Sequence, residues 1–121
     1  RSSIYQQFKA GLKEFEGKIH WQDVTSGIET NGHVAAFRVS TVKRNQILAE
    51  LKKSGVEALF HYVPLHDSPF AKEMGFAPKK DLPNTRLISD GLVRLPIYYG
   101  MANSDVQEVV EKTAQVLRAN L

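Results

Sequence analysis

Helical stripes of apolar residues occur at both ends and in the middle of this 121-residue chain. Such stripes must be buried against another element, so they constrain the architecture before any motif is considered. They predict helices over residues 1–15, 42–55 and 104–121, the first closed by Gly17 and the last opened by a Ser104/Gln107 capping box. The inward-facing residues are expected to be Ile4, Phe8, Leu12 and Phe15 in the first helix, Val42, Ile47, Leu48 and Leu51 in the second, and Val106, Val109, Val110, Thr113, Val116 and Leu117 in the third.

Short runs rich in β-branched and aromatic residues lie between these helices. They predict strands over residues 18–24, 33–40, 56–63 and 92–99, and Pro96 favours an edge position or a bulge for the last. Residues 67–90 are expected to be a long loop, because Pro69, Pro78 and Pro83 break any long element. This order predicts an α+β domain with a small, mostly antiparallel or mixed sheet and helices packed mainly on one face.

Composition argues against several classes of function. The net charge is only +3, and the basic residues form no stripe interleaved with aromatics, so no nucleic-acid partner is expected. Cysteine is absent and the histidines show no ligand spacing, so no metal site is expected. No apolar run approaches the length of a membrane helix, so no membrane partner is expected. The lack of cysteine also suits a reducing compartment such as the cytoplasm.

The stretch HYVPLHDSP, residues 61–69, carries the densest group of candidate ligand-binding side chains. His61 and Tyr62 end a predicted strand, and Pro64 then turns the chain so that His66 lies on a loop. Histidine and tyrosine can hydrogen-bond sugar hydroxyls or phosphate oxygens. For His61 the plainer interpretation is a satisfied core histidine, whereas for His66 ligand binding and an ordinary loop position are equally supported. Arg94 can pair with a carboxylate or phosphate, or with one of the chain's own acids.

Several stretches in order also resemble a known family. These are RxxIYxxFxxxL, NGHxxxFRV, LAELKKSGVEALFHYVPLH, DLPNTxxISD and RLPIY, and they extend over nearly the whole chain. Together they resemble the C-terminal part of the DegT/DnrJ/StrS family of PLP-dependent sugar aminotransferases. HYVPLHDSP, followed by Gly75 and Phe76, looks closest to the TDP-4-keto-6-deoxyglucose transaminases. Where the family commonly reads Ser-x-Arg, this chain has Ser89, Asp90 and Gly91, so no role is transferred to Gly91.

The resemblance implies a small C-terminal domain of the aspartate-aminotransferase fold. Residues 1–17 would be the end of the interdomain helix and residues 18–121 the small domain. The parent enzyme would be a cytoplasmic homodimer with PLP bound mainly by an N-terminal domain. It would move an amino group from glutamate to a nucleotide-linked 4-keto-6-deoxy sugar for surface-polysaccharide synthesis.

The same resemblance implies substrate-binding roles for His66 and Tyr62, with His61 and Arg94 as weaker candidates. No lysine has a recognisable PLP-lysine context, so catalytic and cofactor-binding residues are not expected in this chain, which by itself should not catalyse transamination. The alternative is a stand-alone binding or assembly module without enzymatic activity.

Overall fold

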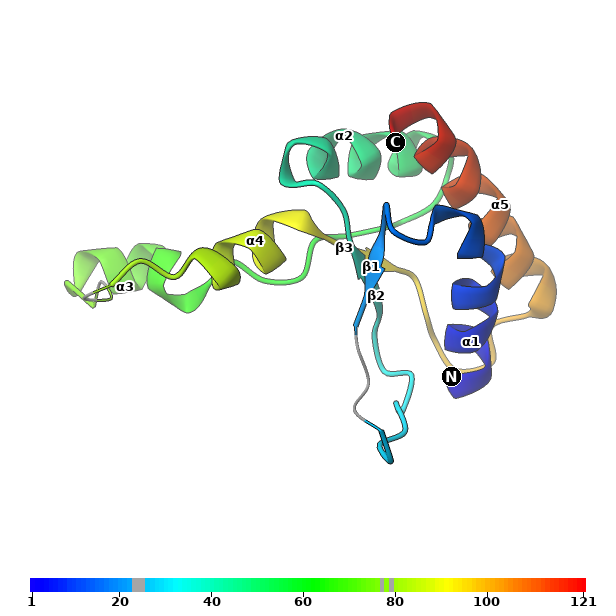
Figure 1. Cartoon of the computed structure of the whole chain (residues 1–121), viewed down its shortest axis with the longest axis horizontal. Coiled ribbons are helices and arrows are strands. Elements are labelled where there is room, and N and C mark those ends of the chain that lie inside the picture. The colour runs from blue at the N-terminus through cyan, green and yellow to red at the C-terminus, as the bar shows by residue number, and fades with distance from the viewer. Residues whose placement is uncertain (23–25, 77, 79) are drawn as a thin grey trace.

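A three-stranded antiparallel sheet organises the computed structural model, which describes residues 1–22, 26–76, 78 and 80–121. The strands β1 (His20–Trp21), β2 (Ala35–Arg38) and β3 (Leu92–Leu95) lie in the order β1-β2-β3 (Figure 1). The sheet register pairs Phe37 of β2 with Val93 of β3 and with Trp21 of β1. The expected α+β class is therefore confirmed.

One face of the sheet forms the core. Successive side chains of a strand point to opposite faces, so Phe37 and Val93 share the buried face, and both are fully inaccessible to solvent. The helices α1 (Ser2–Gly11), α2 (Thr41–Lys53) and α5 (Asn103–Asn120) pack together on this side (Figure 1). Their apolar stripes join the sheet in one cluster.

The predicted stripes are confirmed with local exceptions. Val42 is wrong as an inward-facing residue, because its side chain is 82% exposed. The first helix ends at Gly11 rather than near Gly17, and Phe15 is buried from a 3₁₀ turn, Lys13–Phe15.

The capping box is also wrong. Helix α5 begins at Asn103 with Ala102 as its N-cap, so Ser104 lies inside the helix. The Ser104 hydroxyl instead donates to the neighbouring Asp105 carboxylate at 3.4 Å.

Proline shortens two predicted strands. Residues 56–63 make only an isolated bridge in which Leu59 and Arg94 exchange backbone hydrogen bonds of 3.0 and 2.7 Å, and the chain turns away toward Pro64. Likewise β3 ends at Leu95, because Pro96 has no backbone N–H to donate. The first two predicted strands are present but shorter, and Asp23 and Val24 lie outside the described residues.

Residues 67–90, expected as a loop, mostly belong to a protruding helical arm. We use the term arm for residues 63–90, which contain the 3₁₀ turn η2 (Leu65–Asp67), helix α3 (Pro69–Glu73) and most of helix α4 (Pro83–Gly91) (Figure 1). The loop prediction is wrong because Pro69 and Pro83 lie in the first turns of α3 and α4. There the missing N–H costs nothing and the fixed φ favours the helix.

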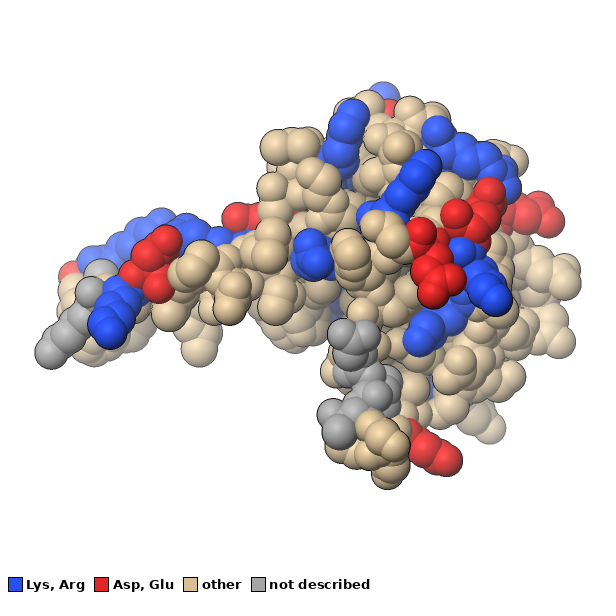
Figure 2. Space-filling model, in the orientation of Figure 1, with Lys and Arg blue, Asp and Glu red and all other residues tan. Residues whose placement is uncertain are grey.

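On the face shown in Figure 2, lysine and arginine are interspersed with aspartate and glutamate. Among the described helices, none is long and apolar enough to cross a membrane.

Helices α1 and α5 pack closely where Gly11 meets Val110, and this contact can be tested by substitution. A Cβ added at Gly11 would lie 2.5 Å from Val110 Cγ1 and 3.0 Å from Val110 Cγ2. We expect Gly11→Ala to destabilise the chain by about 1–3 kcal/mol, because overpacking outweighs the gain in helix propensity. Chemical denaturation of the single variant, of Val110→Ala and of the double variant measures this. The cost of Gly11→Ala should largely disappear in the Val110→Ala background, and an equal cost in both backgrounds would show that the two helices do not meet as described.

Candidate functional site

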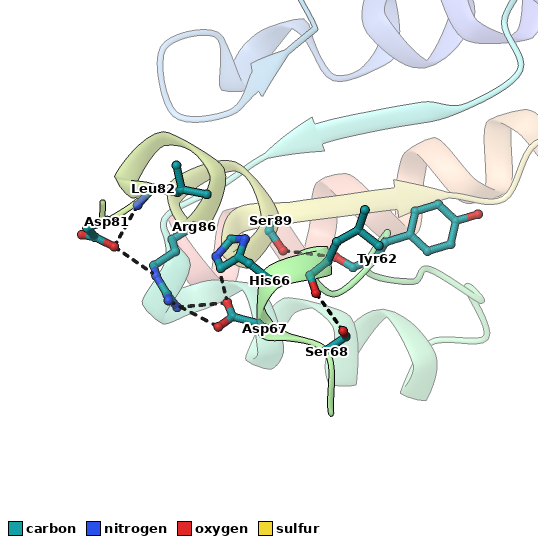
Figure 3. Close-up of polar contacts among 9 residues, drawn as sticks. Tyr62, His66, Asp67, Ser68, Asp81, Leu82, Arg86 and Ser89 are labelled. Atoms are coloured by element: carbon teal, nitrogen blue, oxygen red, sulfur yellow. Dashed lines mark hydrogen bonds and ion pairs between the residues drawn. The ribbon is translucent and has the colours of Figure 1, made fainter. Parts of the chain in front are cut away.

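The candidate stretch HYVPLHDSP forms the outgoing leg of the arm. After the bridge at Leu59, the chain passes through Tyr62 and Pro64 into η2. The returning leg is α4, and the Ser89 hydroxyl donates to the Tyr62 carbonyl oxygen at 3.2 Å (Figure 3). The two legs are thus tied together at Tyr62, whose own side chain is 71% exposed.

Arg44 of α2 contacts both legs where they leave the core. Its Nε donates to the Asp90 carbonyl oxygen at 2.9 Å, and its guanidinium lies over the Phe60 ring at 5.7 Å. The root of the arm is therefore held by one cation from the helical layer.

Contacts among ionisable side chains, beginning with His66, link η2 to α4. Its Nε2 lies 3.5 Å from Asp67 Oδ2, and the Arg86 guanidinium holds the Asp67 carboxylate by donations of 3.0 and 3.3 Å (Figure 3). Arg86 Nε also lies 3.5 Å from Asp81 Oδ1. A bidentate pair fixes the plane of the carboxylate as well as its position.

The imidazole of His66 is mostly buried, but not all of its hydrogen-bonding atoms have partners. Its side chain is 12% exposed, and Nε2 is buried without a hydrogen-bond partner among the described atoms. The backbone around it is fixed, because Ser68 caps α3 by accepting from the Ala71 N–H at 3.1 Å and donates to the Leu65 carbonyl oxygen at 2.7 Å. Because Nε2 is closed to solvent and faces Asp67, a ligand would reach this nitrogen only after a local movement of the imidazole.

His61 lies at the sheet, apart from the contacts among His66, Asp67 and Arg86. Its ring packs on that of Tyr62 with 4.3 Å between centroids, while Nδ1 is buried with no hydrogen-bond partner among the described atoms. Burial, followed by the nearby Arg94 guanidinium, lowers the pKa of His61 below its usual range. The interpretation as a satisfied core histidine is wrong, because the residue is only partly buried and its ring is unsatisfied.

Arg94 occupies β3 on the face opposite the core. Its backbone makes the bridge to Leu59, and its side chain lines a shallow groove with His33, Glu57 and Tyr98. The candidate residues thus form two groups, with His61 and Arg94 at the sheet and His66 on the arm. Tyr62 joins them through the His61 ring contact and the Ser89 hydrogen bond.

Sequence reasoning missed Arg86, Ser89 and Arg44. Each acts across a long sequence separation, so no local pattern reports its partner. No group of His, Cys, Asp and Glu suited to a metal ion occurs within residues 1–22, 26–76, 78 and 80–121.

The arm carries more apolar surface than a folded chain normally leaves in water. Leu65 is 87% exposed, and Phe70, Met74 and Phe76 are each more than half exposed. The Phe70 and Phe76 rings pack edge-on, with centroids 6.2 Å apart. Exposed apolar residues gathered on one segment are typical of a surface that another protein segment covers.

Comparison with known proteins decides the family. The model of the DegT/DnrJ/EryC1/StrS aminotransferase family matches residues 1–114. This chain belongs to that family. The match extends from α1 into α5 and includes the whole arm.

Two solved structures and one sequence are similar to this chain over a part of their length. A putative sugar aminotransferase from Streptococcus pneumoniae, solved in its PMP form, is 27% identical with a TM-score of 0.83, over 98% of this chain and 30% of that one. DesV from S. venezuelae is 22% identical with a TM-score of 0.82, over 94% of this chain and 30% of that one. An uncharacterized protein of Methanocaldococcus jannaschii is 32% identical over 79 residues, which are 65% of this chain and 20% of that protein. The chain spans about a third or less of these relatives.

The environment of His61 predicts its titration. We expect a pKa below the ordinary value of 6.5, measured by the pH dependence of the imidazole NMR shifts. Arg94→Met should raise this pKa only partly, because burial is the larger cause. Since the unfolded chain takes up this proton at a higher pH, the contribution of His61 to stability should be complete above about pH 6.5 and fall as the pH drops toward the folded pKa. A pKa at or above 6.5 would contradict the described burial.

The Arg86–Asp67 pair predicts a local effect. Because the guanidinium is about half exposed, we expect Arg86→Gln to change global stability by less than about 1 kcal/mol. The same change should speed amide hydrogen exchange in residues 65–73, since η2 loses its tie to α4. The matched control is Arg118→Gln, which breaks the Arg118–Glu14 pair away from the arm and should leave that exchange unaltered. Equal exchange in both variants would show that Arg86 does not hold the arm.

Proposed function

We propose that this chain is the C-terminal small domain of a longer sugar aminotransferase. The observation that carries the proposal is the family match over residues 1–114, in a chain that spans only 30% of a structurally similar sugar aminotransferase. Residues 1–17 would end the helix that joins the two domains, and residues 18–121 would form the small domain. The arm's exposed apolar residues support this arrangement, because a large domain would cover them.

The proposed reaction moves an amino group from glutamate to a nucleotide-linked 4-keto-6-deoxy sugar for surface-polysaccharide synthesis. The stretch HYVPLHDSP supports this substrate class through its resemblance to the TDP-4-keto-6-deoxyglucose transaminases. We infer a cytoplasmic homodimer as the working form, again from the family.

The described residues do not fit PLP by themselves. A PLP enzyme needs a lysine for the Schiff base and an acid beside the pyridine nitrogen. Neither lysine nor acid is among the described residues that line the cavity formed by Ala36, Arg38 and Leu92, and none of the described lysines is buried. We infer that the rest of the protein holds PLP, which supplies the electron sink when bound. This chain alone would not catalyse transamination.

His66 and Tyr62 are the proposed contacts to the sugar. The His66 imidazole, whose side chain is 12% exposed, can hydrogen-bond a hydroxyl, and the exposed Tyr62 ring can pack against the sugar or donate its own hydroxyl. Asp67 and Arg86 would hold His66 in place. His61 and Arg94 would lie further along the same wall, with Arg94 able to attract an anionic part of the substrate.

A test uses the longer protein that contains this chain. We expect His66→Ala to lower kcat/KM for the keto sugar about ten-fold or more, because one buried hydrogen bond to the substrate is lost. The visible absorbance of bound PLP should stay unchanged, since His66 contacts the sugar and not the cofactor.

Arg118→Gln is the control, because Arg118 lies away from the arm and pairs with Glu14. Wild-type turnover in His66→Ala would remove His66 from the sugar site. A native product with a mass near 13.6 kDa would contradict the proposed longer enzyme and favour a stand-alone module.

A further inference from the structure

The sheet face opposite the core contains a cavity of about 610 Å³. Strand alternation places Ala36 and Arg38 of β2 and Leu92 of β3 on this face. The cavity is lined by these three residues and by His20, His61 and Ile88, among others. Its volume lies within the range of about 300–1,000 Å³ that is usual for small-molecule sites.

Arg38 is held in a defined position across the sheet. A Cβ at Gly91 would lie 2.8 Å from Arg38 Cγ and 2.5 Å from the Val39 carbonyl oxygen, so only glycine leaves room for the arginine stem. The Arg38 stem therefore lies directly against the backbone at Gly91, and this contact limits where its side chain can run on the open face of the sheet.

The His61 imidazole lies at the same cavity. Its Nδ1 is closed to solvent and has no hydrogen-bond partner among the described atoms, which is costly for a polar atom. Arg94 adds positive charge nearby, since its guanidinium acts electrostatically on the His61 ring. His20, paired with Arg38 in the β1–β2 register, supplies another imidazole on this side.

The charged side chain among the described residues that line the cavity is positive. Arg38 is accompanied by imidazoles, and no aspartate or glutamate is among the described residues that line the cavity. Ile88 of α4 and Leu92 of β3 provide an apolar wall beside these donors. The lining thus combines donors suited to a negative group with a surface suited to a short carbon skeleton.

We propose that this cavity binds an oxyanion, a carboxylate or a phosphate carried on a small organic molecule. Arg38 would donate to two of its oxygens, and the His61 imidazole would donate beside it. Ile88 and Leu92 would pack against the attached carbon skeleton.

The source of the oxyanion rests on the proposed function. If the parent protein is a sugar aminotransferase, the oxyanion is either a carboxylate of the amino donor or the diphosphate of the nucleotide sugar. The site itself needs neither PLP nor the longer protein. Its test is therefore separate from the test of the proposed function.

The experiment is an NMR titration of the 121-residue chain with glutarate, deoxythymidine diphosphate and inorganic phosphate. We expect saturable shifts of the His61 imidazole and the Arg38 guanidinium signals. One of the two organic anions should bind more tightly than inorganic phosphate, because its carbon atoms meet the apolar wall. Tighter glutarate binding assigns the site to the amino donor, and tighter nucleotide binding assigns it to the nucleotide sugar.

Variants separate this site from general attraction to a basic surface. Arg38→Met should weaken binding about ten-fold or more, since a bidentate charge-assisted contact is lost. Arg38→Lys keeps the charge and the packing over Gly91 but loses the planar fork, so it should also weaken binding if the contact is bidentate. Arg118→Met removes the same charge far from the cavity and should leave the affinity unchanged.

Circular dichroism checks that each variant is folded. If Arg38→Met does not fold, Arg38→Lys alone tests the role of the guanidinium. The proposal would be overturned by the absence of saturable binding of all three anions. It would also be overturned if Arg38→Lys and Arg118→Met had the same affinity as the unsubstituted chain, or if the shifts were centred on His66 instead of His61.

Discussion

The two faces of the β2–β3 pair are the constraint on which the rest of the structure depends. Phe37 and Val93 face the helices and are fully buried, so the residues next to each of them along its strand face the other way. A slip of one strand by one residue in this register would move its arginine, Arg38 or Arg94, into the core, where an unpaired cation is very costly. Burial of the apolar face therefore also fixes the positive charge of the opposite face, and with it the chemistry that this face can perform.

The arm depends on a different kind of interaction. The core is held by apolar contacts, whereas the described contacts that hold the arm are mainly polar: Arg44 at its root, Ser89 at Tyr62 and Arg86 at Asp67. Such exposed contacts hold geometry but contribute little free energy. Leu65 and Phe70 stay exposed, so apolar burial among the described residues adds little to the stability of the arm. The arm therefore combines a defined local geometry around His66 with an open apolar surface.

Much of the fold could be predicted, because periodicity reports burial directly. Ile47 and Leu117 were identified as core residues from helical spacing alone, and both are fully buried. The sequence does not predict the arm, because proline breaks the interior of a helix but favours its first turn, where Pro69 and Pro83 lie. Of the candidate site, the sequence indicated His66 and Tyr62 through local density of polar groups. It could not indicate Arg86 or Ser89, since contacts between distant segments leave no periodic signal.

The geometry of the arm's root has a consequence for how such domains diversify. The outgoing leg leaves the sheet at the Leu59–Arg94 bridge, and the returning leg re-enters it at Gly91, close to that bridge along β3. The excursion therefore begins and ends at neighbouring points of one strand. Lengthening such an excursion adds only slowly growing loop-closure entropy, about 0.6 kcal/mol for each doubling of its length. Insertions, deletions or exchange of the whole segment could thus alter the ligand preference of the domain while the register of the sheet remained unchanged.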